Sequence, residues 1–199
     1  MERLFRFALI VMILVALVSC GVFFTPIEGR WNIADPKNEL LTFTPIIDGY
    51  VHYNATPVWE DLMELIAWPD SKIIVLCFDT ADFPDVVAAS YLRLTVKMKP
   101  SPDAAELSIY RIISSWRTSE ISYDFVNNNP GVFFDDSVVT RFTVPSTVYT
   151  GDHIQIPVTE VFSGDKEKLS NGIIIYSSIE VSFESTETGP APLLLVEPE

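Results

Sequence analysis

One run decides the fold class of this chain: Ala89-Ser90-Tyr91-Leu92-Arg93-Leu94-Thr95-Val96-Lys97-Met98. Successive side chains of a β-strand point to opposite faces of a sheet, and here apolar residues alternate with polar ones. The alternation predicts a half-buried strand. Its core face holds Leu92, Leu94, Val96 and Met98, and its outer face holds Arg93, Thr95 and Lys97.

Similar alternation recurs along the rest of the chain, in Val138–Val144, Ile154–Val158 and Ile179–Phe183. Clusters of Pro, Gly, Asn and Asp separate these runs and predict turns. Roughly nine to eleven short strands with such punctuation are typical of an all-β jelly-roll β-sandwich. Two segments leave the choice of element open. Residues 57–68 fit a helix or a strand, and residues 159–169 fit a short helix or two turns.

The N-terminus has the layout of a secretory signal. Arg3 and Arg6 precede an apolar core, and Ser19 stands directly before Cys20. The cysteine at the cut resembles the lipobox of bacterial lipoproteins, which implies that residues 1–19 are a signal peptide and that Cys20 is lipidated. Residues 20–40 then form a lipid-anchored linker, and the protein is extracytoplasmic at the cell membrane or outer membrane.

An uncleaved N-terminal anchor helix is the alternative. Residues 7–24 are 18 residues without a charge, and a bilayer span needs about 17–25 apolar residues. Both alternatives place the remainder of the chain outside the cytoplasm, since the basic residues precede the apolar run.

The charge of the chain excludes some partners. The formal net charge is −14, so phosphate groups are repelled and nucleic-acid binding is not expected. An acidic surface also disfavours docking on anionic lipid, which leaves the N-terminal lipid anchor to hold the protein at the membrane. The second cysteine, Cys77, lies in an apolar run and is expected to be a small buried side chain.

From residue 41 to residue 196 the order of motifs resembles the DNRLRE-domain family, secreted jelly-roll modules related to carbohydrate-binding modules. The motifs are Phe43–Val51, Ile74–Asp79, Leu107–Ile112, Ile156–Thr159 and Asn171–Ile175. The DNRLRE string itself is absent. The resemblance implies a domain over 41–199 that is exported and non-catalytic, and it does not name the ligand.

Flat aromatic rings stack on the C–H faces of sugars, so exposed aromatic residues are the candidates for a binding site. Trp59 and Trp68 flank the segment that fits a sandwich least well, and Tyr53 lies just before it. Irregular segments on rigid scaffolds often carry function. We therefore expect Tyr53, Trp59 and Trp68 to bind a polysaccharide or glycan. A structural lipoprotein that binds another envelope protein is the alternative.

No motif in the sequence indicates catalysis or a cofactor. The chain has no Gly-x-Ser-x-Gly elbow, phosphate-binding loop or His-Glu-x-x-His zinc motif. An enzyme of the glycosidase type would need two carboxylates converging in a cleft. The oxygen-rich stretch around Asp135-Asp136 leaves a calcium site open, although it matches no EF-hand loop. We expect no catalytic residue, no cofactor and no metal ligand.

Lipidation of Cys20 is directly testable. Replacing Cys20 by Ala removes the only atom that the acyl chain is expected to modify. Cells that express the variant and receive a radioactive fatty acid should show no labelled protein, whereas the wild type is labelled. Labelling that persists in Cys20→Ala would contradict the lipobox interpretation.

Overall fold

The longest strand, β5 (Val87–Met98), organises a six-stranded sheet in the computed structural model, which describes residues 40–55, 64–99, 101–163 and 169–199. Tyr91 pairs with Pro157 of β8 and with Leu195 of β11, so these two strands lie on opposite edges of β5. β10 pairs with the second half of β5, on the same side as β11. β1 pairs with β11, and β3 pairs with β10. The bounds are β1 Leu41–Phe43, β3 Leu65–Ala67, β8 His153–Pro157, β10 Val181–Phe183 and β11 Leu193–Pro198.

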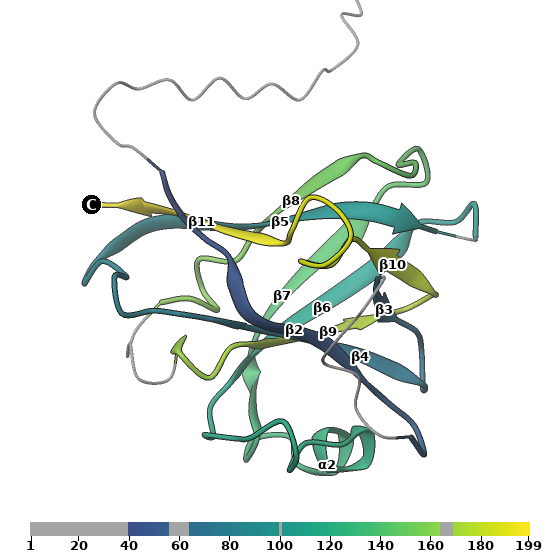
Figure 1. The fold of residues 1–199 in the computed structure, drawn as a ribbon, viewed down its shortest axis with the longest axis horizontal. Coiled ribbons are helices and arrows are strands. Elements are labelled where there is room, and N and C mark those ends of the chain that lie inside the picture. Colours follow the sequence, from purple (N-terminus) through teal and green to yellow (C-terminus); the bar gives the residue numbers. More distant parts are fainter. Residues whose placement is uncertain (1–39, 56–63, 100, 164–168) are drawn as a thin grey trace, which may run out of the picture. The chain divides into compact units, whose positions relative to one another are not determined.

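The second sheet has five antiparallel strands in the order β2-β4-β9-β6-β7 (Figure 1). Its bounds are β2 Pro45–His52, β4 Lys72–Phe78, β6 Ala105–Ile112, β7 Phe134–Val144 and β9 Ile173–Ser177. Apart from register shifts in β2 and β6, neighbouring residues pair one to one across the sheet. The predicted all-β sandwich is confirmed.

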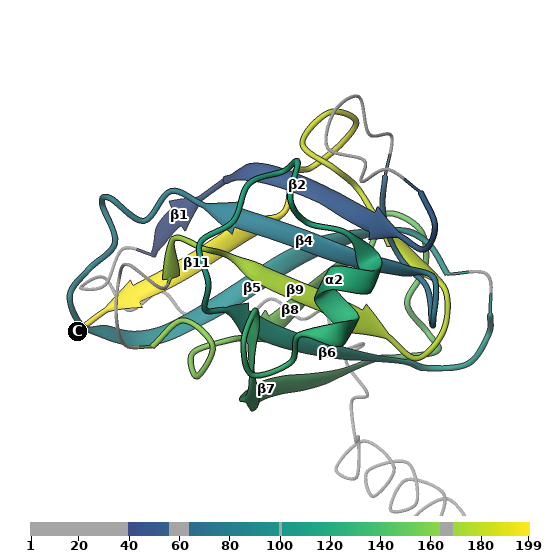
Figure 2. The same cartoon turned by 90° about the horizontal axis from the view of Figure 1, so that it is seen from below.

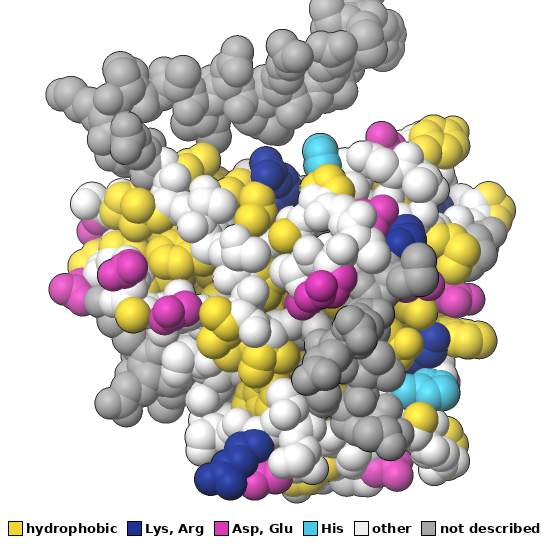
Figure 3. Space-filling view, in the orientation of Figure 1, with side chains coloured by type: hydrophobic (Ala, Val, Ile, Leu, Met, Phe, Trp, Pro, Cys, Tyr) yellow, Lys and Arg dark blue, Asp and Glu magenta, His cyan; other side chains and the backbone are white. Residues whose placement is uncertain are grey.

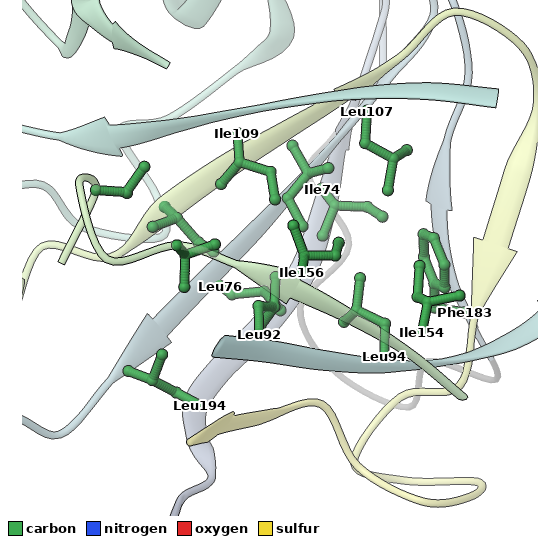
Figure 4. Close-up of a cluster of buried hydrophobic side chains, with 14 of the residues drawn as sticks. Ile74, Leu76, Leu92, Leu94, Leu107, Ile109, Ile154, Ile156, Phe183 and Leu194 are labelled. Carbon is green, nitrogen blue, oxygen red and sulfur yellow. The ribbon is translucent and has the colours of Figure 1, made fainter. Parts of the chain in front are cut away.

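The inner faces of the two sheets share one hydrophobic core. Leu92 and Leu94 of β5 pack in the same cluster as Leu76 of β4 and Ile109 of β6 (Figure 4). Leu92 and Val96 are fully buried, as the alternation predicted, and Leu94 is 1% exposed. Burying the apolar faces of two sheets against each other removes them from water, which is the main force that stabilises this architecture.

A second hydrophobic cluster covers the outer face of the five-stranded sheet. Helix α2 (Tyr123–Asn128) lies on that face, away from β5 and β8 (Figures 1 and 2). Its buried residues, Tyr123 and Val126, pack with Val75 of β4 and Ile174 of β9. β4 and β9 are therefore buried on both faces, which explains why they read as continuous apolar runs rather than as alternating ones.

Several sequence predictions fall on residues that the structure does not describe. Cys20, Trp59, the signal 1–19 and the linker up to residue 39 lie outside the described residues. Of the segment 57–68, residues 65–67 form β3, a strand rather than a helix. Residues 159–162 form turns. No helix in the described ranges is both long enough and apolar enough to span a bilayer.

The predicted exposure of two β5 residues needs correction. Thr95 lies on the outer face but is only 5% exposed, because the connection from β10 to β11 crosses it. Its hydroxyl lies 2.9 Å from Nδ1 of His153 and donates to the carbonyl of Pro190 at 3.5 Å. Met98 is 40% exposed because it ends the strand. A surface loop, which alternation alone does not reveal, decides the burial of Thr95.

Two substitutions on adjacent residues of β5 test these packing assignments. Leu94→Ala should lower the free energy of unfolding by about 2–5 kcal/mol, since it leaves a cavity in the core. Thr95→Ala should lower it by about 1 kcal/mol through loss of a hydrogen bond. Denaturant titration measures both, with the exposed Gln155→Ala of β8 as a control that stays near the wild type. Equal losses at positions 94 and 95 would contradict the assigned faces.

Candidate functional site

A tight turn between β3 and β4 carries the exposed Trp68. The Trp68 carbonyl accepts hydrogen bonds from the amides of Ser71 and Lys72, at 3.1 and 2.9 Å, and the Trp68 amide donates to the Lys72 carbonyl. Pro69 has the fixed φ that suits the second turn position, and Asp70 takes a left-handed φ of 54°. The turn places Trp68 directly opposite Lys72. Because β3 and β4 belong to different sheets, it is also a crossing between the two layers.

Lys72 lies between two aromatic rings. Its ammonium is 5.0 Å from the ring centroid of Tyr50 and 5.8 Å from that of Trp68. Such contacts attract a cation to the negative face of the ring, by about 0.5–1 kcal/mol at an exposed site. We call Tyr50, Trp68 and Lys72 the turn site. The Trp68 side chain is 45% exposed, so much of this ring remains open to solvent.

The electrostatics of the turn site keep the Tyr50 phenol neutral. Burial raises the pKa of Tyr50, and the nearby carboxylate of Glu64 raises it further. Both effects disfavour the phenolate. At neutral pH the site therefore combines a phenol hydroxyl, an ammonium and an indole ring, which can donate hydrogen bonds and provide a flat apolar surface.

Tyr53, which with Trp68 is one of two described aromatics of the predicted site, is only partly associated with the turn site. Its amide donates to the Ser71 carbonyl at 2.8 Å, so its backbone adjoins the turn. Its ring meets Tyr123 edge-on, with 5.7 Å between centroids, and thus lies with the α2 cluster, whereas Tyr50 packs against the inter-sheet core. Tyr53 is 49% exposed. Trp59 lies outside the described residues, so its place in the site stays a prediction.

Lys72 is the residue that sequence reasoning missed. The signal was present in Trp68-Pro69-Asp70-Ser71-Lys72, because residues that flank a short turn face each other across the hairpin. Tyr50 of β2 pairs with Ile74 of β4, two residues after Lys72, so the register of these two strands brings Tyr50 close to Lys72. On the face drawn in Figure 3, hydrophobic side chains are interspersed with acidic and basic ones.

The Asp135-Asp136 stretch carries an ion pair. Nη2 of Arg111 lies 3.3 Å from Oδ2 of Asp135, while its Nη1 donates to the Ser163 carbonyl at 2.7 Å. Hydrogen bonds from the hydroxyl and amide of Ser137 and the charge of Arg111 lower the pKa of Asp135, against the opposite effect of burial. A lowered pKa is the reverse of what a general acid requires. Among the residues that the structure describes, no group of three or more metal-ligating side chains converges.

His153 and Cys77, two further side chains that could be reactive, each contact another group of the protein. His153 is exposed and its Nδ1 faces the Thr95 hydroxyl. The thiol of Cys77 donates to the Ser170 carbonyl at 3.0 Å. Burial, and secondarily the charge of Asp79, raises the pKa of Cys77 to about 11, so the thiol stays protonated at neutral pH. The expected burial of Cys77 is confirmed.

Comparison with known proteins gives no match: no family model matches this chain, and no curated protein does either. The resemblance of residues 41–196 to the DNRLRE-domain family stays a prediction from the sequence motifs.

The lowered pKa of Asp135, set first by Ser137 and then by Arg111, predicts a pH dependence of stability. Because the folded pKa of Asp135 lies below its ordinary value of 3.8, its contribution is present above that value and is lost as the pH falls through the lowered pKa. Asp135→Asn should lower the melting temperature at pH 7. It should also reduce the fall in melting temperature between pH 7 and pH 2. The exposed neighbour variant Asp136→Asn is the control. An unchanged fall in melting temperature in Asp135→Asn would contradict this role.

Proposed function

We propose that this chain is a non-catalytic, membrane-anchored extracytoplasmic lipoprotein whose β domain recognises polysaccharide or glycan. The observation that carries the proposal is the half-exposed Trp68 ring beside the ammonium of Lys72. An indole can stack on the apolar face of a sugar, and Lys72 and the Tyr50 hydroxyl can bond its oxygens. The N-terminal signal with Cys20 supports the anchor and the location.

The strand order supports the jelly-roll part of the proposal. Within the two sheets, β1-β11-β5-β8 and β4-β9-β6-β7 are two sets of four neighbouring strands. The chain changes layer at five of the seven steps between β4 and β11, as it does in two interlocked Greek keys. This is the arrangement that the resemblance to carbohydrate-binding modules implies.

One observation favours the second candidate, a structural lipoprotein that binds another envelope protein. Phe125 of α2 is 41% exposed and Val132, shortly after the helix, is 65% exposed. They flank Phe133, whose ring meets Phe125 at 5.2 Å between centroids. Neighbouring exposed apolar side chains are a feature of protein-binding surfaces.

Replacement of Trp68 distinguishes the two candidates. Trp68→Ala should weaken binding to a glycan found on an array about tenfold, which corresponds to about 1.4 kcal/mol. It should change the free energy of unfolding by only about 1 kcal/mol, because the ring is half exposed and makes one cation–π contact. Titration calorimetry and thermal melting on the same full-length protein measure both.

Tyr149→Ala is the matched control, because Tyr149 is an aromatic that is 71% exposed between β7 and β8, away from the turn site. It should leave glycan affinity unchanged. If the wild type binds no glycan on the array, the polysaccharide proposal is wrong. If Trp68→Ala and Tyr149→Ala lose affinity equally, the turn site is not the binding site.

A further inference from the structure

β7 (Phe134–Val144) ends the five-stranded sheet and pairs only with β6 within it. It is eleven residues long, and Figure 2 shows it at the open edge of the sheet. Edge strands expose unpaired main-chain groups that can add another strand. The directions of these groups therefore determine what β7 can bind.

The hydrogen bonds of β6 fix those directions. The Ser178 amide donates to the Glu106 carbonyl, and the Ile112 amide donates to the Gly172 carbonyl, so the even residues of β6 face β9. The odd residues then face β7, where Leu107 pairs with Phe142 and Ile109 pairs with Thr140. Main-chain groups alternate sides along a strand. Phe142 and Thr140 consequently bond β6, and the amides and carbonyls of Val139, Arg141 and Thr143 point outward.

No group in the described parts of the chain bonds the outward amides and carbonyls of these three residues. The other edges differ. β1 and β3 have three residues each, and β8 carries Pro157, which has no amide hydrogen. Along β2 the Asp48 carboxylate accepts hydrogen bonds from the amide and hydroxyl of Thr186, so a loop adjoins that edge. Over residues 139–144, where β7 pairs one to one with β6, the outward main-chain groups of β7 therefore form an uncovered ladder.

We propose that β7 pairs antiparallel with β7 of a second copy of this chain, about a two-fold axis at Thr140. In this register Thr140 faces Thr140, and Val139 exchanges hydrogen bonds with Arg141 of the other copy. Val138 of each copy then faces Phe142 of the other copy. Phe142 already packs against the inter-sheet core on this side. The register centred on Arg141 would oppose two like charges, which is unfavourable in a sheet.

The sequence of β7 suits a partner of the same sequence. Residues 137–144 contain no acidic side chain, and Arg141 is their only charge. Asp135, at the start of the strand, is already paired with Arg111. The net charge of −14 on each copy opposes association at long range. Added salt screens that repulsion, so pairing should strengthen between low and physiological ionic strength.

Disulfide trapping tests the register in the full-length chain, in excess detergent and with Cys20 replaced by Ala. Opposed residues of a non-hydrogen-bonded antiparallel pair have Cα atoms about 4.5 Å apart, within the range that a disulfide spans. Thr140→Cys should therefore form a covalent dimer on mild oxidation. Thr143→Cys, on the same strand but facing Ser137 of the other copy, should not. Cross-linking through Arg141→Cys in place of Thr140→Cys, or through neither, overturns the proposal.

A proline variant tests the pairing without a cross-link. Proline is tolerated on an edge strand where its missing amide hydrogen would point to solvent. Arg141→Pro should keep the circular dichroism spectrum of the wild type but halve the protein mass measured by sedimentation equilibrium. A wild type that sediments as a monomer at physiological salt overturns the proposal. If Arg141→Pro alters the spectrum, Arg141→Glu takes its place. It raises the net negative charge of each copy from −14 to −16, and the added repulsion should shift the equilibrium to monomer.

Discussion

Burial of one face of β5 is the constraint on which both the sandwich and the turn site depend. Leu92, Leu94 and Val96 form the centre of the six-stranded sheet's inner face, and a slip of one residue would turn all three toward water. β10 takes its register from β5, and β3 takes its register from β10. The position of Trp68, just after β3, is therefore fixed through three strands by the packing of β5.

Two cations of this acidic domain have fixed partners on the protein. Lys72 lies between aromatic rings at one crossing between the sheets, and Arg111 bonds a carboxylate and a carbonyl near another. In both places a positive charge has fixed partners instead of moving freely in solvent. The lowered pKa of Asp135 keeps its carboxylate ionised, which is the reverse of what a general acid requires. Rigid charge and flat rings suit binding better than proton transfer.

Alternation predicted the strands whose sequence alternates apolar with polar residues, and it failed for the strands that are apolar on both faces. β5 and β8 were found from their sequence, since one face of each is polar. β4 has apolar residues on both faces because α2 covers its outer side, and a continuous apolar run carries no period. α2 itself was hidden, because its six residues end in the Asn-rich stretch that was taken for a turn. Thr95 was misjudged because a loop distant in sequence covers it, and the partnership of Trp68 with Lys72 required the hairpin geometry.

The pairing of β1 with β11 brings the two ends of the domain together. Leu41 lies opposite Val196, so the chain enters and leaves the six-stranded sheet at the same place. Adjacent ends are the condition under which a domain tolerates circular permutation. A short linker from Glu199 back to Leu40, with new termini opened at the exposed Thr150-Gly151 turn, would keep every strand pairing of both sheets. The order of the strands along the chain is thus separable from their order in space.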